Sequence, residues 1–94
     1  MTTKLDPIPP GEILLEEFLL PLGISQNRLA GDRDVPVSRV SGIVKGKRGI
    51  TADTALRLAE YLGTSPEMWL QLQASYDMRV ARQTYWPAAR TRIR

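Results

Sequence analysis

Hydrophobic residues recur at helical spacing in five successive segments of this 94-residue chain, and no stretch alternates long enough to predict a β-strand. The first segment runs from Pro10 to Leu20, and Pro21 and Gly23 predict its end. Its apolar arc is wider than one core-facing stripe requires. Two explanations stay open: both sides of this helix pack within the domain, or one side contacts a partner chain.

Capping residues divide the rest of the chain into four more helices. Ser25, Thr51 and Ser65 are residue types whose side chains cap helix N-termini. Gly46 and Gly63 suit the left-handed backbone that ends many helices. The predicted helices are a second after Ser25, a third over 36–46, a fourth over 52–63 and a fifth over 66–83. The chain is therefore predicted to be all-α, with an extended arm over 1–9, a five-helix domain over 10–84 and a mobile basic tail over 85–94.

The stretch over 24–46 is predicted to form two short helices joined by a tight turn. Val40, Ile43 and Val44 place one apolar stripe on the second of these helices. The outward positions, which are short or basic, are Val37, Ser38, Arg39, Gly42 and Lys45. This pattern is typical of a helix-turn-helix, whose second helix lies in the major groove of DNA. It predicts a repressor-like DNA-binding domain.

Base contacts are expected from the first exposed residues of the second helix and from a residue one turn later. These are Val37, Ser38, Arg39 and Gly42. Arg39 can donate two hydrogen bonds to guanine O6 and N7, Ser38 can bond to a base or a phosphate, and Val37 can pack on a thymine methyl group. Gly42 adds no base contact of its own, but it allows the helix backbone to come close to the DNA.

Charge is distributed unevenly along the chain, although its net value is only +3. Residues 36–50 contain four basic and no acidic residues, and residues 78–94 contain five arginines and no acidic residue. A concentrated basic surface is the electrostatic footprint of phosphate binding. The predicted phosphate contacts are Gln26, Lys45, Lys47 and Arg48. We interpret the arginines of the tail as solvated, with a second phosphate contact or a partner contact as the alternatives.

The composition excludes several classes of function. The chain has no cysteine and no histidine, which removes disulfides, thiol nucleophiles, the usual zinc ligands and the usual general base. Neither an enzyme, a metal site nor a cofactor is therefore predicted. No apolar run approaches the roughly 18 residues of a membrane span, and the N-terminus has no apolar signal core. A cytoplasmic protein without membrane contact is expected.

Three stretches of the chain resemble the HigA-type antitoxins, a branch of the phage-repressor-like (Cro/XRE) helix-turn-helix family. They are PGEILLEEFLLPLGIS at 10–25, LA at 29–30 and VPVSRVSGIVKGKRGITADTALRLAEYLGTSPEMWLQLQASYDM at 35–78. The run GTSPEMWLQLQ at 63–73 is the most specific, because generic repressors lack it. The resemblance implies a helical protein, usually dimeric, that binds a palindromic operator at its own promoter. It also implies a partner, a HigB-type toxin that cleaves mRNA as a ribonuclease of the RelE class.

One place in the chain, two residues long, departs from the family pattern. The family usually has an apolar residue and a glycine just before Val35, where this chain has Arg33 and Asp34. Aspartate tolerates the left-handed conformation of that glycine better than most residues. We expect Arg33 to extend its charged end into solvent from a normally buried position.

The surfaces for protein partners are predicted from apolar and acidic residues. A homodimer would place two recognition helices about one DNA turn (~34 Å) apart, so that it reads a palindrome. The fifth-helix residues expected to divide between core and dimer interface are Trp69, Leu70, Leu72 and Tyr76. A basic toxin would suit the acidic cluster on the first helix, near Asp6 of the arm; a solvated helix face is the alternative. That cluster consists of Glu12, Glu16 and Glu17.

Two other functions stay open. One is a stand-alone phage-type or metabolic repressor without a toxin partner. The other is a protein-binding helical module whose basic loop is merely solvated. A neighbouring gene for a small basic ribonuclease would favour the antitoxin, and salt-dependent DNA binding would exclude the protein-binding module.

Overall fold

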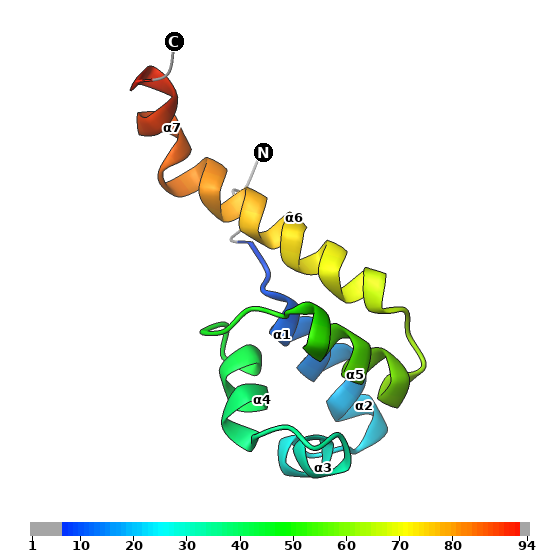
Figure 1. Ribbon diagram of the computed structural model, residues 1–94. Coiled ribbons are helices and arrows are strands. Elements are labelled where there is room, and N and C mark those ends of the chain that lie inside the picture. The colour runs from blue at the N-terminus through cyan, green and yellow to red at the C-terminus, as the bar shows by residue number, and fades with distance from the viewer. Residues whose placement is uncertain (1–6, 93–94) are drawn as a thin grey trace.

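Residues 7–92 are described by a computed structural model, and they form helices without any strand (Figure 1). The first helical segment joins α1 (Pro10–Ile13), the π-helical turn η1 (Leu14–Leu19) and α2 (Leu20–Leu22) without a break. The following elements are α3 (Gln26–Asp32), α4 (Val37–Val44), α5 (Ala52–Leu62), α6 (Pro66–Thr84), α7 (Trp86–Ala89) and the 3-10 turn η2 (Arg90–Arg92). The all-α prediction and its five helices are confirmed, and α7 is a sixth helix that was not predicted.

The predicted helix ends are correct at most of the capping residues. The side-chain oxygens of Ser25, Thr51 and Ser65 accept hydrogen bonds from backbone N–H groups three residues later, at 3.0, 3.4 and 3.1 Å. Gly46 and Gly63 have φ angles of 75°, in the left-handed region. Ser25, Thr51, Ser65 and Gly63 therefore lie at the cap positions of their helices, whereas α4 ends at Val44 with Lys45 as its C-cap and Gly46 lies one residue beyond.

Three details of the prediction are wrong. Pro36 caps α4 and is not its first residue. Pro21 does not end the first helix, because it lies at the start of α2, where the preceding π turn leaves no α-helical hydrogen bond for its missing N–H to break. Residues 86–92, which were assigned to a mobile tail outside the five helices, form helical turns. Residues 1–6 of the predicted arm and 93–94 of the tail lie outside the described residues.

The π-helical turn explains the wide apolar arc of the first helix. Leu14 and Leu19 are both 1% exposed although they are five residues apart, a spacing that would point them about 140° apart on an α-helix. The N–H of Leu20 donates to the carbonyl of Leu15, the five-residue bond of a π-helix, which brings both buried leucines to one face. Leu20 and Leu22 stay more than half exposed.

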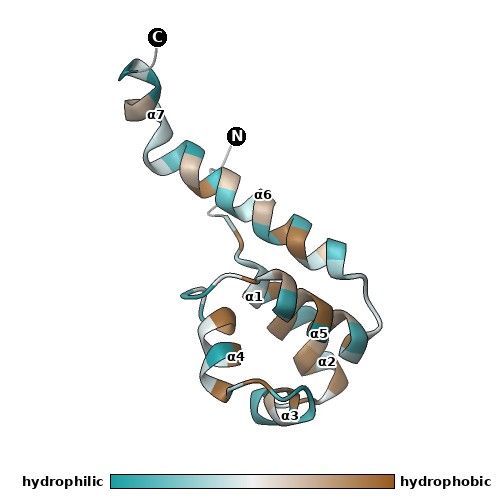
Figure 2. Ribbon diagram, in the orientation of Figure 1, coloured by the Kyte–Doolittle hydropathy of each residue, from teal (hydrophilic) through white to brown (hydrophobic). Residues whose placement is uncertain are grey.

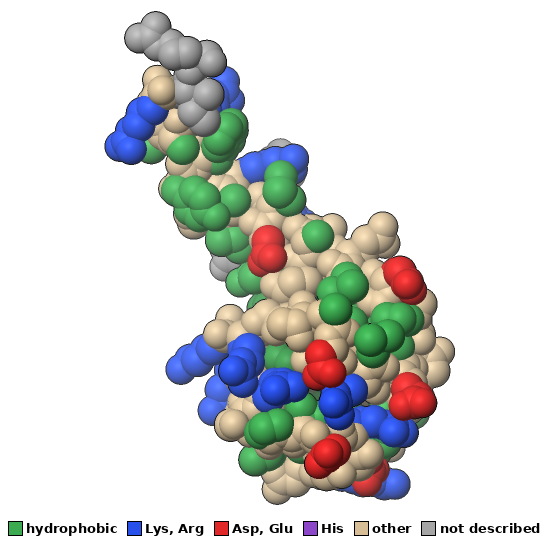
Figure 3. Space-filling model, viewed as in Figure 1, with side chains coloured by type: hydrophobic (Ala, Val, Ile, Leu, Met, Phe, Trp, Pro, Cys, Tyr) green, Lys and Arg blue, Asp and Glu red, His purple; other side chains and the backbone are tan. Residues whose placement is uncertain are grey.

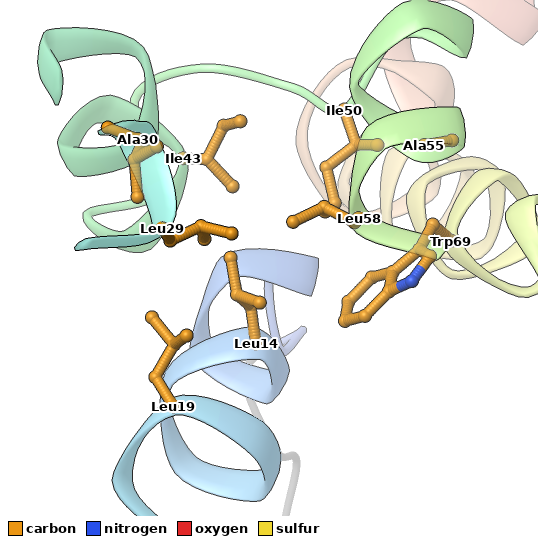
Figure 4. Close-up of a cluster of buried hydrophobic side chains, with 10 residues drawn as sticks. Leu14, Leu19, Leu29, Ala30, Ile43, Ile50, Ala55, Leu58 and Trp69 are labelled. Atoms are coloured by element: carbon orange, nitrogen blue, oxygen red, sulfur yellow. The ribbon is translucent and has the colours of Figure 1, made fainter. Parts of the chain in front are cut away.

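The core lies where the first helix, the α3–α4 pair and α5 meet (Figure 4). Trp69 of α6 is fully buried in this core, packs against Phe18 with ring centroids 5.4 Å apart, and donates its indole N–H to Thr64 at 2.7 Å. A buried tryptophan with its N–H satisfied removes a large apolar surface from water. The first half of α6 is thereby fixed to the body.

The second half of α6 projects from this body and carries α7 at its tip (Figure 1). The radius of gyration is 15.3 Å, against about 12 Å for a globular chain of this length. The longest dimension is 48 Å, twice the shortest of 23 Å. The tip of the loop after α4 is hydrophilic, whereas α2 in the body is largely hydrophobic (Figure 2). Within residues 7–92, none of the helices is at once long and apolar enough to cross a bilayer.

Candidate nucleic-acid interface

The turn between α3 and α4 is built around Asp34. Its φ is 54°, which is the left-handed conformation expected at this position. Val35 then donates its backbone N–H to the carbonyl of Ala30 at 2.9 Å, which closes the turn onto α3. Aspartate thus adopts here the left-handed conformation, which it tolerates better than most residues other than glycine.

Arg33 fixes the same turn to α5. Its guanidinium lies 5.0 Å from the centre of the Tyr61 ring and 3.5 Å from a carboxylate oxygen of Glu60. The Tyr61 hydroxyl donates to Asp32 at 2.5 Å, and this hydrogen bond raises the pKa of Tyr61. The expectation that Arg33 reaches into solvent is wrong in part, because its charge is held between a ring face and an acid.

The outer face of α4 is available for contact. Val40 and Ile43 are buried, whereas Val37 is 47% exposed and Ser38 is exposed. Ser41 is half-buried. It lies on the outward side of α4 between Val37 and Ser38, because it follows them by four and three residues. Ser41 was missed among the candidate contacts, although its helical spacing from Ser38 and Lys45 could have revealed it.

Arg39 is half-buried at the edge of this face and is already paired. Its Nη1 lies 3.3 Å from Oδ2 of Asp53 in the first turn of α5. The same carboxylate oxygen accepts from Nε of Arg57 at 3.0 Å. Sequence spacing gave no signal for this pairing, because fourteen residues and a loop separate Arg39 from Asp53.

Gly42 is not a bare patch of backbone. A β-carbon at this position would lie 3.3 Å from the β-carbon of Arg48, so the stem of Arg48 covers it. Gly42 is half-buried beside this stem, and the close approach of its backbone to DNA stays a prediction. The absence of a side chain makes room for Arg48 over α4.

The basic loop after α4 is held at both ends. The backbone N–H groups of Lys47 and Arg48 donate to the carbonyl of Gly42 at 2.9 and 3.1 Å. At the other end, the N–H of Ile50 donates to Oε1 of Gln73 on α6 at 2.8 Å. These bonds hold the exposed residues Lys45, Lys47 and Arg48 beside α4. Figure 3 shows lysine and arginine side chains gathered over this part of the molecule.

The remaining candidates lie elsewhere. Gln26 is half-buried in the first turn of α3, at a helix N-terminus that can hold a phosphate. Glu12, Glu16 and Glu17 are all exposed on the first helix. Of the dimer candidates, Trp69 belongs to the core, Leu72 and Tyr76 are half-buried, and Leu70 is 39% exposed. Within the described part of the chain, no three acidic side chains lie close enough together to hold a metal ion.

Comparison with known proteins adds a family to this geometry. Residues 15–69 match the helix-turn-helix family HTH_3. Virulence-associated protein I of Dichelobacter nodosus is 51% identical over 76 residues, which cover 81% of this chain and 70% of that protein. Antitoxin HigA-1 of Vibrio cholerae is 39% identical over 88 residues, which cover 94% of this chain and 83% of that protein.

A solved structure agrees with the fold. Pseudomonas aeruginosa antitoxin HigA, solved with the higBA promoter, superposes with a TM-score of 0.89 at 40% identity and covers 94% of this chain and 96% of that one. The family match over 15–69 spans α3, α4, the basic loop and α5, and the family consists of DNA-binding proteins without enzymatic activity. The chain belongs to the helix-turn-helix family HTH_3 and is closely related to the HigA-type antitoxins.

Proposed function

We propose that this protein is a HigA-type antitoxin that binds operator DNA at its own promoter through α3 and α4, represses its operon and neutralises a HigB-like ribonuclease. One observation carries the proposal: α4 presents an open face beside a basic loop that is anchored to α4 and to α6. Such a pairing provides base reading by the helix and phosphate binding by the loop. The similarity to an antitoxin solved with its promoter supports this assignment.

The division of roles on this surface follows from position: α4 supplies the proposed base contacts, and its end, the loop after it and the first turn of α3 supply the proposed phosphate contacts. Val37, Ser38 and Arg39 are the proposed base contacts, and Ser41 joins them because it lies on the outward side of α4. Lys45, Lys47, Arg48 and Gln26 are the proposed phosphate contacts. Arg48 lies over Gly42, so the two residues share that point of the proposed interface.

A homodimer formed through the projecting part of α6 and α7 is the assembly that suits a palindromic operator. Met78, Tyr85 and Trp86 are 50%, 64% and 43% exposed there, and Met78, Ala81 and Trp86 line one shallow hollow. Figure 3 shows apolar side chains along this projection. An exposed apolar surface on a helix that leaves its own domain is typical of a protein interface.

The toxin contact is proposed on the first helix. Glu12, Glu16 and Glu17 are exposed there, and a ribonuclease that binds RNA is expected to carry a basic surface. The exposed Leu20 and Leu22 follow on the same helix and supply apolar area beside the acids. This surface belongs to a different helix from the proposed DNA-binding face.

A reporter gene and a growth assay test the two activities separately. The reporter is placed under the promoter upstream of the gene for this protein, and expression of the protein is expected to repress it. In the growth assay, the protein is expected to restore growth of cells that express the ribonuclease-like gene expected beside its own. Unchanged reporter expression would refute operator binding, while repression without growth rescue would indicate a stand-alone repressor.

A further inference from the structure

Asp53, in the first turn of α5, lies outside the recognition helix but contacts its arginine. We infer that Asp53 is a positioning residue: it orients the guanidinium of Arg39 before DNA arrives, and thereby sets the base that the protein prefers at one position of its operator. This inference rests on the proposed function, in which α4 enters the major groove.

The carboxylate of Asp53 is itself fixed from the opposite side. Its Oδ2 accepts from Nε of Arg57 at 3.0 Å, and Nη1 of Arg57 donates to the backbone carbonyl of Arg33 at 2.7 Å. The contacts therefore run from the turn of the helix-turn-helix, through α5, to Nη1 of Arg39 at 3.3 Å. Each group in this series holds the next, so Arg39 is restrained relative to the turn that places α4.

Fold stability does not account for the Arg39–Asp53 pair. The Asp53 side chain is 55% exposed and that of Arg39 is 33% exposed, so solvent screens their attraction. The core beneath α4 and α5 is apolar and joins these helices without the pair. A solvent-screened ion pair that Arg57 and the carbonyl of Arg33 connect to the turn has a larger effect on the orientation of Arg39 than on unfolding.

The chemistry of the guanidinium leaves Arg39 able to read a base while it is held. A guanidinium has five N–H donors, and Asp53 contacts it at Nη1, which leaves donors for the O6 and N7 acceptors of guanine. An arginine held before binding loses less conformational freedom on binding than a free one. Asp53 also lines one hollow with Arg39 and Arg48, where its negative charge opposes unselective attraction to phosphates.

The test compares Asp53→Asn with the matched control Glu67→Gln. Both changes are isosteric, both remove one negative charge from the first turn of a helix, and Glu67 lies on α6 away from Arg39. Affinities are measured for the protein's own promoter site and for variants in which each base pair is replaced in turn. Arg39→Ala and the double variant Arg39→Ala/Asp53→Asn are measured in parallel, and thermal unfolding checks that each protein is folded.

The expected result is a loss of preference at one base pair. Asp53→Asn should lose discrimination by about fivefold or more at the position where Arg39→Ala loses it, since one bidentate arginine contact supplies discrimination of that order. Glu67→Gln should keep the wild-type profile, and the double variant should match Arg39→Ala because both changes remove the same contact.

Three outcomes would overturn the inference. If Asp53→Asn keeps the full base profile while Arg39→Ala loses one position, Asp53 does not position Arg39 and the proposed function is unaffected. If Asp53→Asn binds the operator more tightly with its preference retained, Asp53 blocks Arg39 and does not orient it. If no variant alters the base profile, the base-reading role of Arg39 fails together with the inference. A complete lack of promoter binding by the wild-type protein is a different result, and it would refute the proposed function itself.

Discussion

In the proposed interface, side chains of α4 read the DNA sequence and side chains of the loop after α4 bind phosphates. Val37, Ser38 and Arg39 lie near the start of α4, while Lys47 and Arg48 lie in a loop whose backbone is bonded to Gly42. Contacts to base edges carry sequence information, and contacts to phosphates carry affinity that falls with salt. Substitutions in the two groups should therefore have different effects.

Arg39→Ala should weaken operator binding by about 1–3 kcal/mol and relax preference at one base pair, because a bidentate contact to guanine is lost. The measurement is a titration against the operator and against single-base variants of it. An affinity and a base profile equal to those of the wild type would show that Arg39 of α4 does not read a base.

Lys47→Ala should weaken binding to all DNA sequences about equally and reduce the salt slope of binding by about one, because one phosphate contact is lost. The measurement is the binding constant at several salt concentrations. The control is Arg79→Ala on the exposed side of α6, which removes one positive charge away from the loop. A salt slope that stays unchanged in Lys47→Ala excludes the contact.

At the scale of elements, the position of α4 depends on close packing against the first helix. Gly11 of α1 is buried, and a β-carbon there would lie 1.7 Å from the backbone carbonyl oxygen of Ile43. Only glycine allows the two helices to approach this closely. The end of the recognition helix is thus located by a residue in the first turn of the domain.

Gly11→Ala should destabilise the protein by about 1–3 kcal/mol or more, because α4 has to move away from α1. Operator affinity should fall as well, even at temperatures where the variant is folded. Gly31→Ala is the control: a β-carbon there meets nothing within 4 Å, and a helical glycine replaced by alanine stabilises by about 0.4–1 kcal/mol. Equal stability of both variants, measured by thermal unfolding, would show that the α1–α4 contact is loose.

Helix existence and helix ends could be predicted from the sequence, because caps and apolar spacing act locally. Ser25, Thr51 and Ser65 cap their helices as expected. The π turn at Leu14–Leu19 was not predicted, because a five-residue spacing of buried leucines resembles a wide α-helical face. The Arg39–Asp53 pair was missed for a different reason: it depends on how α4 and α5 pack, and no local pattern contains that information.

At the scale of the whole molecule, the projecting end of α6, together with α7, carries an apolar surface that lies apart from the body with α3 and α4. The sequence led us to expect dimer contacts from Trp69 to Tyr76, but the exposed apolar residues of the projection lie further along the chain, at Met78, Tyr85 and Trp86. The apolar stripe of α6 was visible in the sequence. Which part of it the protein's own core covers could not be predicted, because that depends on where α5 and the first helix end.

Met78→Asp should shift a dimer toward monomer and weaken binding to the full palindrome more than to a half-site, because a charge is placed in an apolar interface. The measurements are sedimentation equilibrium and titration against both DNAs. Leu56→Asp is the matched control, since Leu56 is 60% exposed on α5, which belongs to the body and not to the projection. A wild-type protein that is already monomeric at the concentrations of DNA binding would disprove the assignment.

The central claim, sequence-specific operator binding by α4 and its basic loop, is tested most directly by one titration. The purified protein is titrated against its own upstream promoter DNA and against a scrambled control of equal length, at two salt concentrations. Tight binding to the promoter alone, falling steeply with salt, is the predicted result. Equal and weak binding to both DNAs would contradict the claim and would leave the helix-turn-helix without a role in reading DNA.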